Sequence, residues 1–281
     1  MSYPLVTIMA GNTHTTCVGW SRDGAPGELT RWKTHDAGIF HEDLKLKRNT
    51  SPNPYAPLQK LANATTRLVL AGVTPAYQAD LKHWLEACGY TVLLFRATLQ
   101  PRLEIVPVPP EKVGDDRIAA VLGAVALDAQ LPAVVVDSGT ALTINALTPA
   151  ASKAHLPRFE GGLIMPGQDM MLGALNRFTK QLPRVDPISA PAQANDSTWI
   201  GRTTEQAMSW GAWHAYVSGA IAAARAQHRL LGSNARVLLT GGGAAELLPL
   251  FKSAFAPNVV PELHANLVHL GLFAAFQAVA P

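Results

Sequence analysis

Val136-Asp137-Ser138-Gly139-Thr140-Ala141 is the stretch of sequence that decides the fold, because the earlier stretch Ile8-Met9-Ala10-Gly11-Asn12-Thr13 resembles it. Both stretches follow an apolar run, centre on glycine and lead into a second run typical of a strand. A strand, a glycine turn and a strand that recur along one chain predict a duplicated domain. Chance similarity between two glycine turns is the alternative, and these residues alone leave it open.

Two glycine turns of this kind can hold a polyphosphate between backbone N–H groups, since a Cβ would block the close approach of the phosphate. The first turn, Gly11-Asn12-Thr13, adds two short polar side chains, although such a tripeptide often only closes a hairpin. The second turn places Asp137 at a strand end, where an acid can bind a cation, and follows it with Thr140. An Asx-type turn at Asp137 is the structural alternative.

Outside these turns, strands alternate with helices, which is typical of an α/β protein. Strands are expected over residues 5–9, 14–20, 67–73, 91–95, 133–136, 141–147 and 236–240. Helices are expected over residues 79–88, 117–129, 170–181, 204–228 and 266–279. The proline-rich stretch 99–112 is expected to connect two halves, so we predict domains over residues 1–115 and 116–281.

The composition narrows the class of protein. Of 281 residues, 48% are hydrophobic and 15% are charged, which indicates a globular chain. The net charge is only +3, and Lys45-Leu46-Lys47-Arg48 is the nearest approach to a basic cluster, so we expect no nucleic-acid partner. The apolar stretch 118–136 is interrupted by polar residues and proline, and we expect no membrane partner. Cys17 and Cys88 form neither a metal-ligand spacing nor a disulfide framework, which favours a cytoplasmic protein.

An acidic segment precedes the predicted helix after the connection. Pro110-Glu111-Lys112-Val113-Gly114-Asp115-Asp116-Arg117 sets two acids and an arginine at a helix start. A hydroxyl that accepts a phosphoryl group needs a carboxylate to orient it and take its proton, and an arginine can grip a substrate carboxylate. Capping of the helix by Asp115 or Asp116 is the alternative, and it explains one acid only.

Two more glycine clusters follow, at Phe159–Gly167 and at Leu239–Gly243. Each predicts backbone packed close to a ligand or to another strand, and a plain turn or hinge is equally open. The nine histidines show no paired metal spacing, and only His14 lies beside a glycine turn. The P-loop motif is absent from the sequence, so a P-loop kinase is not expected.

Taken together, these segments resemble the type III pantothenate kinases, a family of the acetate kinase, sugar kinase, Hsp70 and actin superfamily. The family's motifs occur in order at Gly11–Thr13, Pro110–Arg117 (Pro-x-x-x-Gly-x-Asp-Arg), Asp137–Thr143 (Asp-x-Gly-Thr-Ala-x-Thr), Gly161–Gly167 (Gly-Gly-x-Ile-x-Pro-Gly) and Gly201–Thr204 (Gly-x-x-Thr). Several motifs in the correct order over most of a chain are specific, although no single one would be.

The resemblance implies a fold, an activity and a set of roles. The fold would be a pair of RNase H-like α/β domains, and the activity would be transfer of the γ-phosphate of ATP to pantothenate, with Mg²⁺ and K⁺ or NH₄⁺ as cofactors. The residues implied to bind ATP are Met9, Ala10, Gly11, Asn12, Thr13, His14, Thr15, Thr16 and Thr140. Those implied to bind pantothenate are Gly114, Asp115, Asp116, Arg117 and Thr204, with Asp116 as the general base and Thr204 acting across a homodimer interface. Asp137 would bind the monovalent cation.

The sequence departs from the family pattern at three positions. Met9 replaces the first aspartate, whose carboxylate helps to place the metal and phosphate; Asn145 replaces an acid, and Pro107 replaces a tyrosine. Loss of the first carboxylate leaves open a pseudokinase that binds ligand without catalysis. A related kinase or phosphatase for another small molecule is a third hypothesis, which the complete Pro110–Arg117 motif disfavours.

Overall fold

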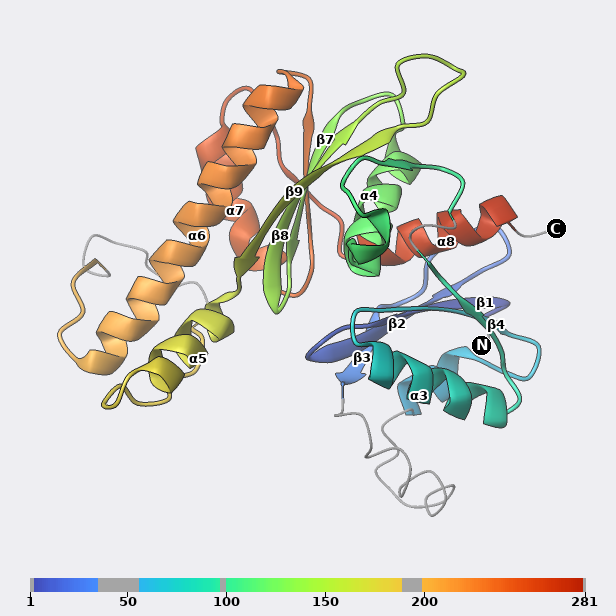
Figure 1. Ribbon diagram of the computed structural model, residues 1–281, viewed down its shortest axis with the longest axis horizontal. Helices are drawn as coiled ribbons and strands as arrows, with labels where there is room; N and C mark the ends of the chain where they lie inside the picture. Colours follow the sequence, from blue (N-terminus) through green and yellow to red (C-terminus); the bar gives the residue numbers. More distant parts are fainter. Residues whose placement is uncertain (1–2, 35–55, 97–99, 189–198, 280–281) are drawn as a thin grey trace. The chain divides into compact units, whose positions relative to one another are not determined.

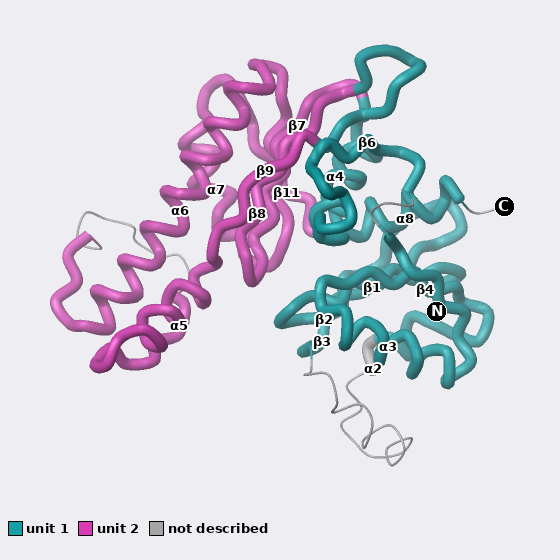
Figure 2. The backbone as a smooth tube through the Cα atoms, viewed as in Figure 1, with its two compact units in different colours: residues 1–129, 150–159, 266–281 teal, residues 130–149, 160–265 magenta. Residues whose placement is uncertain are grey.

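The computed structural model describes residues 3–34, 56–96, 100–188 and 199–279. It divides into two compact units, coloured separately in Figure 2. Unit 1 contains residues 1–129, 150–159 and 266–281, and unit 2 contains residues 130–149 and 160–265. The two units are defined by packing within the structure, whereas the predicted domains were bounded from the sequence. The predicted boundary at residue 115 therefore stays a prediction. The basic run Lys45–Arg48 lies outside the described residues.

Unit 1 is built on a five-stranded sheet with the order β3-β2-β1-β4-β5 (Figure 1). Its strands are β1 (Leu5–Ala10), β2 (His14–Trp20), β3 (Thr30–Lys33), β4 (Arg67–Gly72) and β5 (Thr91–Leu94). Strand β1 is buried throughout, and it pairs antiparallel with β2 and parallel with β4. A continuous apolar strand is what this central position requires, because both of its faces are covered.

Helices cover both faces of this sheet. Helices α2 (Ala56–Leu61) and α3 (Pro75–Ala87) pack against the side chains of Val6 and Ile8. Thr7 points the other way, because side chains alternate along a strand, and it contacts His269 of α8 (Leu267–Val279).

Helix α8 crosses α4 (Asp115–Leu127) at glycines on that second face. A Cβ on Gly271 would lie 1.8 Å from the carbonyl oxygen of Ala119, and one on Gly123 would lie 2.1 Å from that of Leu267. Only glycine allows the two helix backbones to approach this closely. The last helix of the chain therefore belongs to unit 1.

The second sheet has six strands in the order β11-β10-β7-β8-β9-β6. Its strands are β6 (Glu104–Ile105), β7 (Ala133–Ser138), β8 (Ala141–Thr148), β9 (Arg158–Pro166), β10 (Arg236–Thr240) and β11 (Glu262–Leu263). Strand β7 pairs antiparallel with β8 and parallel with β10, just as β1 pairs with β2 and β4. Apart from β6, the strands have the same order in both sheets, which confirms the predicted α/β duplication.

Three helices belong to unit 2: α5 (Gln168–Phe178), α6 (Thr204–Leu231) and α7 (Ala244–Phe255). One core joins Val136 and Ile144 of the sheet to Trp213 of α6 and Phe251 of α7. No helix in the described ranges is both long enough and apolar enough to cross a bilayer.

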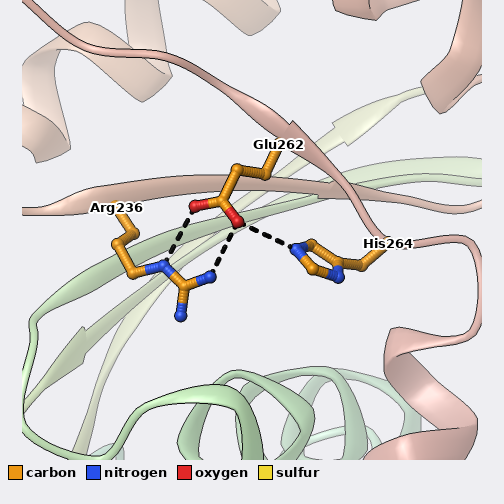
Figure 3. Close-up of polar contacts among 3 residues, drawn as sticks. All are labelled: Arg236, Glu262 and His264. Atoms are coloured by element: carbon orange, nitrogen blue, oxygen red, sulfur yellow. Dashed lines mark hydrogen bonds and ion pairs between the residues drawn. The ribbon is translucent and has the colours of Figure 1, made fainter.

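An ion pair fastens the last strand to this sheet (Figure 3). Arg236 Nε and Nη2 donate to Glu262 Oε1 and Oε2 over 3.0 and 2.8 Å, and His264 Nε2 lies 3.2 Å from Oε2. Hydrogen bonds from Arg236 hold the pKa of Glu262 below its usual value, against the effect of burial, with a smaller contribution from His264. The bidentate geometry fixes the register of a strand that has only two residues.

The strands and helices expected from the sequence do not include β3, β6, β9, β11, α2 and α7. Three of these are strands of two to four residues, too short to show a period. Helix α7 contains Pro249, which cannot donate to the carbonyl of Ala245 and so argues against a helix in sequence. Three expected helices begin two to four residues late, because proline or polar residues occupy the first turns of α3, α4 and α5.

Candidate active site

The first glycine turn closes the β1–β2 hairpin. Gly11 N–H donates to the carbonyl oxygen of His14 over 3.2 Å, and a Cβ on Gly11 would come within 2.7 Å of that oxygen. Asn12, Thr13 and His14 are exposed. Thr34 Oγ1 donates to the Gly11 carbonyl over 2.8 Å and ties the turn to the end of β3. The turn therefore presents polar groups to solvent from a firmly held backbone.

Positive charge gathers beside this turn. Lys33 of β3 lies opposite His14, and Arg31 lies opposite Thr16. Burial lowers the pKa of His14, and the nearby charges of Arg31 and Lys33 lower it further. A neutral imidazole beside two cations gives the turn a positive potential, which suits an anion such as a phosphate.

Met9 lies where the resemblance leads one to expect an aspartate. Its side chain is 7% exposed, and its register partner on β2 is Thr16. His269 touches both strands on this face, with Nδ1 3.0 Å from Thr7 Oγ1 and Nε2 2.9 Å from Thr16 Oγ1. Burial lowers the pKa of His269 to about 3, so the ring is neutral at physiological pH. This face of the hairpin thus carries neither an acid nor a charged imidazole.

The predicted acceptor segment begins α4. Gly114 occupies the N-cap position, and the turn before it, η2, spans Pro110–Lys112. Asp116 Oδ1 accepts a hydrogen bond from the Arg117 backbone N–H over 2.8 Å. Burial raises the pKa of Asp116, opposed by that hydrogen bond and by the Arg117 charge. The Arg117 guanidinium lies 5.3 Å from the centre of the Phe159 ring.

The two adjacent acids differ in their surroundings. The Asp115 carboxylate lies 3.7 Å from Arg96 Nη1, at ion-pair distance. Asp116 is instead crowded against Gly114, where a Cβ would lie 2.4 Å from Asp116 Oδ1. Burial raises the pKa of Asp116, and a carboxylate with a raised pKa is a better proton acceptor than one with an ordinary pKa. The assignment of Asp116 as the base stays a prediction.

The second glycine turn is enclosed by the other glycine clusters of unit 2. Gly139 N–H donates to the Ala141 carbonyl over 3.1 Å, and Gly167 N–H donates to that of Thr140 over 3.2 Å. A Cβ on Gly241 would lie 2.3 Å from Asp137 Oδ1, and one on Gly243 would lie 2.3 Å from Ser138 Oγ. The clusters at 159–167 and 239–243 therefore pack closely on the 137–140 turn, as the sequence predicted for glycine at close approaches.

Tyr216 of α6 is a residue that the sequence reasoning missed. Its hydroxyl lies 2.5 Å from Ser138 Oγ. Burial raises the pKa of Tyr216, the Ser138 hydrogen bond opposes this, and the charges of Asp137 and Glu246 raise it further. Tyr216, Ser138, Gly139 and Gly243 line a small cavity of about 190 Å³ in this unit. A tyrosine inside a long alanine-rich helix carries no sequence signal for such a position.

Thr204 is exposed at the first position of α6. The preceding Thr203 caps the helix, because its Oγ1 accepts from the Gln206 N–H over 3.2 Å. Thr204 belongs to unit 2, whereas the acceptor segment belongs to unit 1. Among the residues placed in the structure, no three His, Cys, Asp or Glu side chains form a group suited to a metal ion.

Comparison with known proteins places these features in a family context. A family model described as type III pantothenate kinase matches residues 5–226. The type III pantothenate kinase of Cupriavidus taiwanensis is 36% identical over 304 aligned positions that cover all of both chains. That of Chlorobaculum parvum is 34% identical over 191 residues, which cover 65% of this chain and 66% of the relative.

A solved structure supports the fold. A proposed 2-dehydro-3-deoxygalactonokinase from Sinorhizobium meliloti matches with a TM-score of 0.54 at 14% identity, over 99% of both chains. At that identity the likeness concerns the fold alone. Together with the shared strand order of the two sheets, it confirms the predicted α/β fold with a duplicated domain.

Proposed function

The chain belongs to the type III pantothenate kinase family, and we infer from this that it transfers the γ-phosphate of ATP to the hydroxyl of pantothenate, the first step of coenzyme A biosynthesis. It is a phosphotransferase with an alcohol acceptor, and its product is 4′-phosphopantothenate. The observation that carries this conclusion is the family match over residues 5–226. Retention of the acids Asp116 and Asp137 argues against the pseudokinase hypothesis that Met9 raised.

Asp116 is the proposed general base. Its raised pKa makes it a stronger proton acceptor than an exposed carboxylate, and the Arg117 N–H holds Oδ1. The second carboxylate oxygen is then available to the pantothenate hydroxyl. Gly114, Asp115 and Arg117 would line the acceptor position, and the Arg117 guanidinium offers a partner for the pantothenate carboxylate.

ATP would bind through its phosphates at the two glycine turns. Residues 9–16 form the first proposed site, supported by the exposed polar turn and the charges of Arg31 and Lys33. Thr140, beside the glycine clusters of unit 2, forms the second. The apolar Met9 offers Mg²⁺ no ligand, so Mg²⁺ would be held by ATP phosphates and water.

Asp137 is the proposed site of the monovalent cation. The donor set fits such an ion, because the Asp137 carboxylate and the Ser138 carbonyl both crowd the position of Gly241 and both offer oxygen. A carboxylate close to bound phosphates would repel them unless a cation lies between the two. K⁺ or NH₄⁺ bound there would offset the charge of Asp137 beside the phosphates.

We also propose a homodimer in which Thr204 reaches the acceptor bound to the partner. Exposed large apolar side chains gather in unit 2 on β9, on α5 and just before α6; these are Leu163, Ile164, Met170, Leu175, Phe178, Trp199 and Ile200. Apolar groups concentrated in this way mark an interaction surface. Light scattering that shows only a monomer at micromolar concentration would contradict this part of the proposal.

A cytoplasmic location is proposed on chemical grounds. Cys17 is buried, Cys88 is exposed, and neither forms a disulfide. Two cysteines outside any disulfide fit a reducing compartment, which also supplies ATP.

The test of the function is a coupled assay of ADP release with pantothenate, run with and without potassium. We expect turnover that depends on pantothenate and rises with potassium. ATP binding without turnover under any cation would instead establish the pseudokinase. Turnover with another alcohol but not with pantothenate would overturn the substrate assignment.

A further inference from the structure

A groove of about 700 Å³ lies within unit 1 along one side of α3 and beside Gly72, the last residue of β4. Gln78 and Lys82 of α3 line it, together with Arg96 after β5 and with Lys112 and Asp115 near the start of α4. Asp116 and Arg117 are not among the residues that line it. The groove therefore includes the first part of the acceptor segment, with Gly114 and Asp115, but not the proposed base.

Gln78 is a buried donor that lacks a partner. Its side chain is 4% exposed, and Oε1 accepts a hydrogen bond from Arg96 Nη1 over 3.1 Å. Nε2 has no hydrogen-bond partner within the part of the chain that the structure describes. A buried N–H left unpaired is costly, so such a group calls for a ligand or a water.

Arg96 supplies charge next to this donor. Its side chain is 46% exposed, and its contacts with Gln78 and Asp115 both use Nη1. The guanidinium carries five N–H donors, so its other nitrogens can bind a further acceptor. A planar guanidinium beside an amide N–H matches the two oxygens of a carboxylate.

The balance of charge in the groove limits the ligand's charge. Three cationic side chains (Lys82, Arg96, Lys112) line it with three carboxylates (Glu86, Glu111, Asp115). Lys82 Nζ lies 2.5 Å from Glu86 Oε1, so that pair is already satisfied. A groove that is formally neutral favours a single negative charge over the double charge of a phosphate monoester.

We propose that the α3 groove is a small-molecule site for a ligand bearing one carboxylate, which Gln78 Nε2 and Arg96 bind together. The volume exceeds what one carboxylate fills and is typical of a site for a small organic molecule. Arg96, which the ligand would contact, also pairs with Asp115, the residue before Asp116. The site concerns binding and does not depend on the kinase activity.

Nuclear magnetic resonance of the ¹⁵N-labelled full chain, without ATP, tests the proposal. The probes are butyrate, its neutral analogue butyramide, methyl phosphate and pantothenate, and the readout is the side-chain amide resonance of Gln78. We expect butyrate to shift this resonance with an affinity about tenfold higher than that of butyramide or methyl phosphate, as for a hydrogen bond to a charged group. Equal shifts with butyrate and butyramide, or none with butyrate, would overturn the proposal.

Two variants and a control complete the test. Gln78→Leu and Arg96→Leu should each weaken butyrate binding about tenfold, as read from backbone amides around the groove. Arg102→Leu removes an exposed arginine outside the groove and should leave binding unchanged. Wild-type affinity in both groove variants would refute the site.

The pantothenate titration identifies the source of the carboxylate. If pantothenate shifts the Gln78 resonance and Gln78→Leu abolishes the shift, the groove receives the carboxylate of the acceptor itself. If only butyrate does so, the groove serves a different carboxylate. The titrations are run without ATP and measure binding alone, so a failure of catalysis and a failure of this site remain distinguishable.

Discussion

His269 makes unit 1 sensitive to acid. The ring is 2% exposed between Thr7 and Thr16, and burial lowers its pKa from 6.5 to about 3. In the unfolded chain the histidine takes up a proton below pH 6.5, whereas in the folded chain it stays neutral until about pH 3. Protonation therefore favours the unfolded state, and the free energy of unfolding must fall as the pH drops through this window.

The magnitude follows from the two pKa values of His269. Linkage gives a loss of about 1.4 kcal/mol for each pH unit well below the unfolded pKa. Between pH 7.5 and pH 5.0 the loss from this single group is about 2 kcal/mol, before contributions from other groups. That is a large share of the stability of an ordinary domain.

The substitution His269→Gln isolates this effect. Glutamine can donate to one threonine hydroxyl and accept from the other, but it does not titrate. As the pH is lowered, we expect the urea unfolding midpoint of the wild type to fall more steeply than that of His269→Gln. The two midpoints should converge or cross toward pH 5. Parallel pH profiles would refute the argument, because they would mean that His269 has the same pKa in the folded and the unfolded chain.

Three further outcomes are expected. Asp116→Asn should lower kcat by about 10² to 10⁴ while ATP binding persists, and Asp115→Asn should lower it far less; the reverse order would move the base to Asp115. Turnover in sodium-only buffer should be weak and restored by potassium or ammonium, and Asp137→Asn should remove that response. Full activity in sodium would contradict the cation assignment. Because Arg236 depresses the pKa of Glu262, the stability that this ion pair adds is complete above the ordinary glutamate pKa of 4.5 and is lost as pH falls through the lower folded value. Glu262→Gln should therefore be less stable than the wild type at neutral pH, and the difference in stability should be smallest in acid. Chemical denaturation that gives the same difference at both pH values would argue against the ion pair.

The strands and turns that build the proposed site could be predicted because they depend on local sequence. Leu5–Ala10 is apolar except for Thr7, is buried throughout, and is followed by Gly11, where a Cβ would lie only 2.7 Å from the His14 carbonyl oxygen. Ala133–Val136 is likewise apolar and buried, and leads into the turn at Gly139. Recurrence of one pattern was then enough to predict a duplication, and the matching strand orders confirm it.

Long-range packing could not be predicted from these patterns. Nothing local to Gly271 indicates that its helix lies against Ala119 of α4, about 150 residues earlier, and only the crossing reveals why both helices need glycine. Tyr216 is similar, since its contact with Ser138 joins a helix to a distant strand end. The pairing of Arg96 with Gln78 and Asp115 likewise depends on three separate segments.

Met9 and His269 are best understood as one site. Thr7 lies two residues before Met9, Thr16 lies opposite Met9, and His269 contacts both threonines. An aspartate at position 9 would add a negative charge to this buried face, where it would need a partner and would favour a charged imidazole. With methionine there, a neutral His269 leaves no buried charge to be compensated. Arg31 and Lys33 of β3 lie beside the β1–β2 turn. With methionine at position 9, the potential at this turn is more positive than it would be with an aspartate there. A first turn of this charge can attract phosphates directly, so the loss of the carboxylate is compatible with ATP binding.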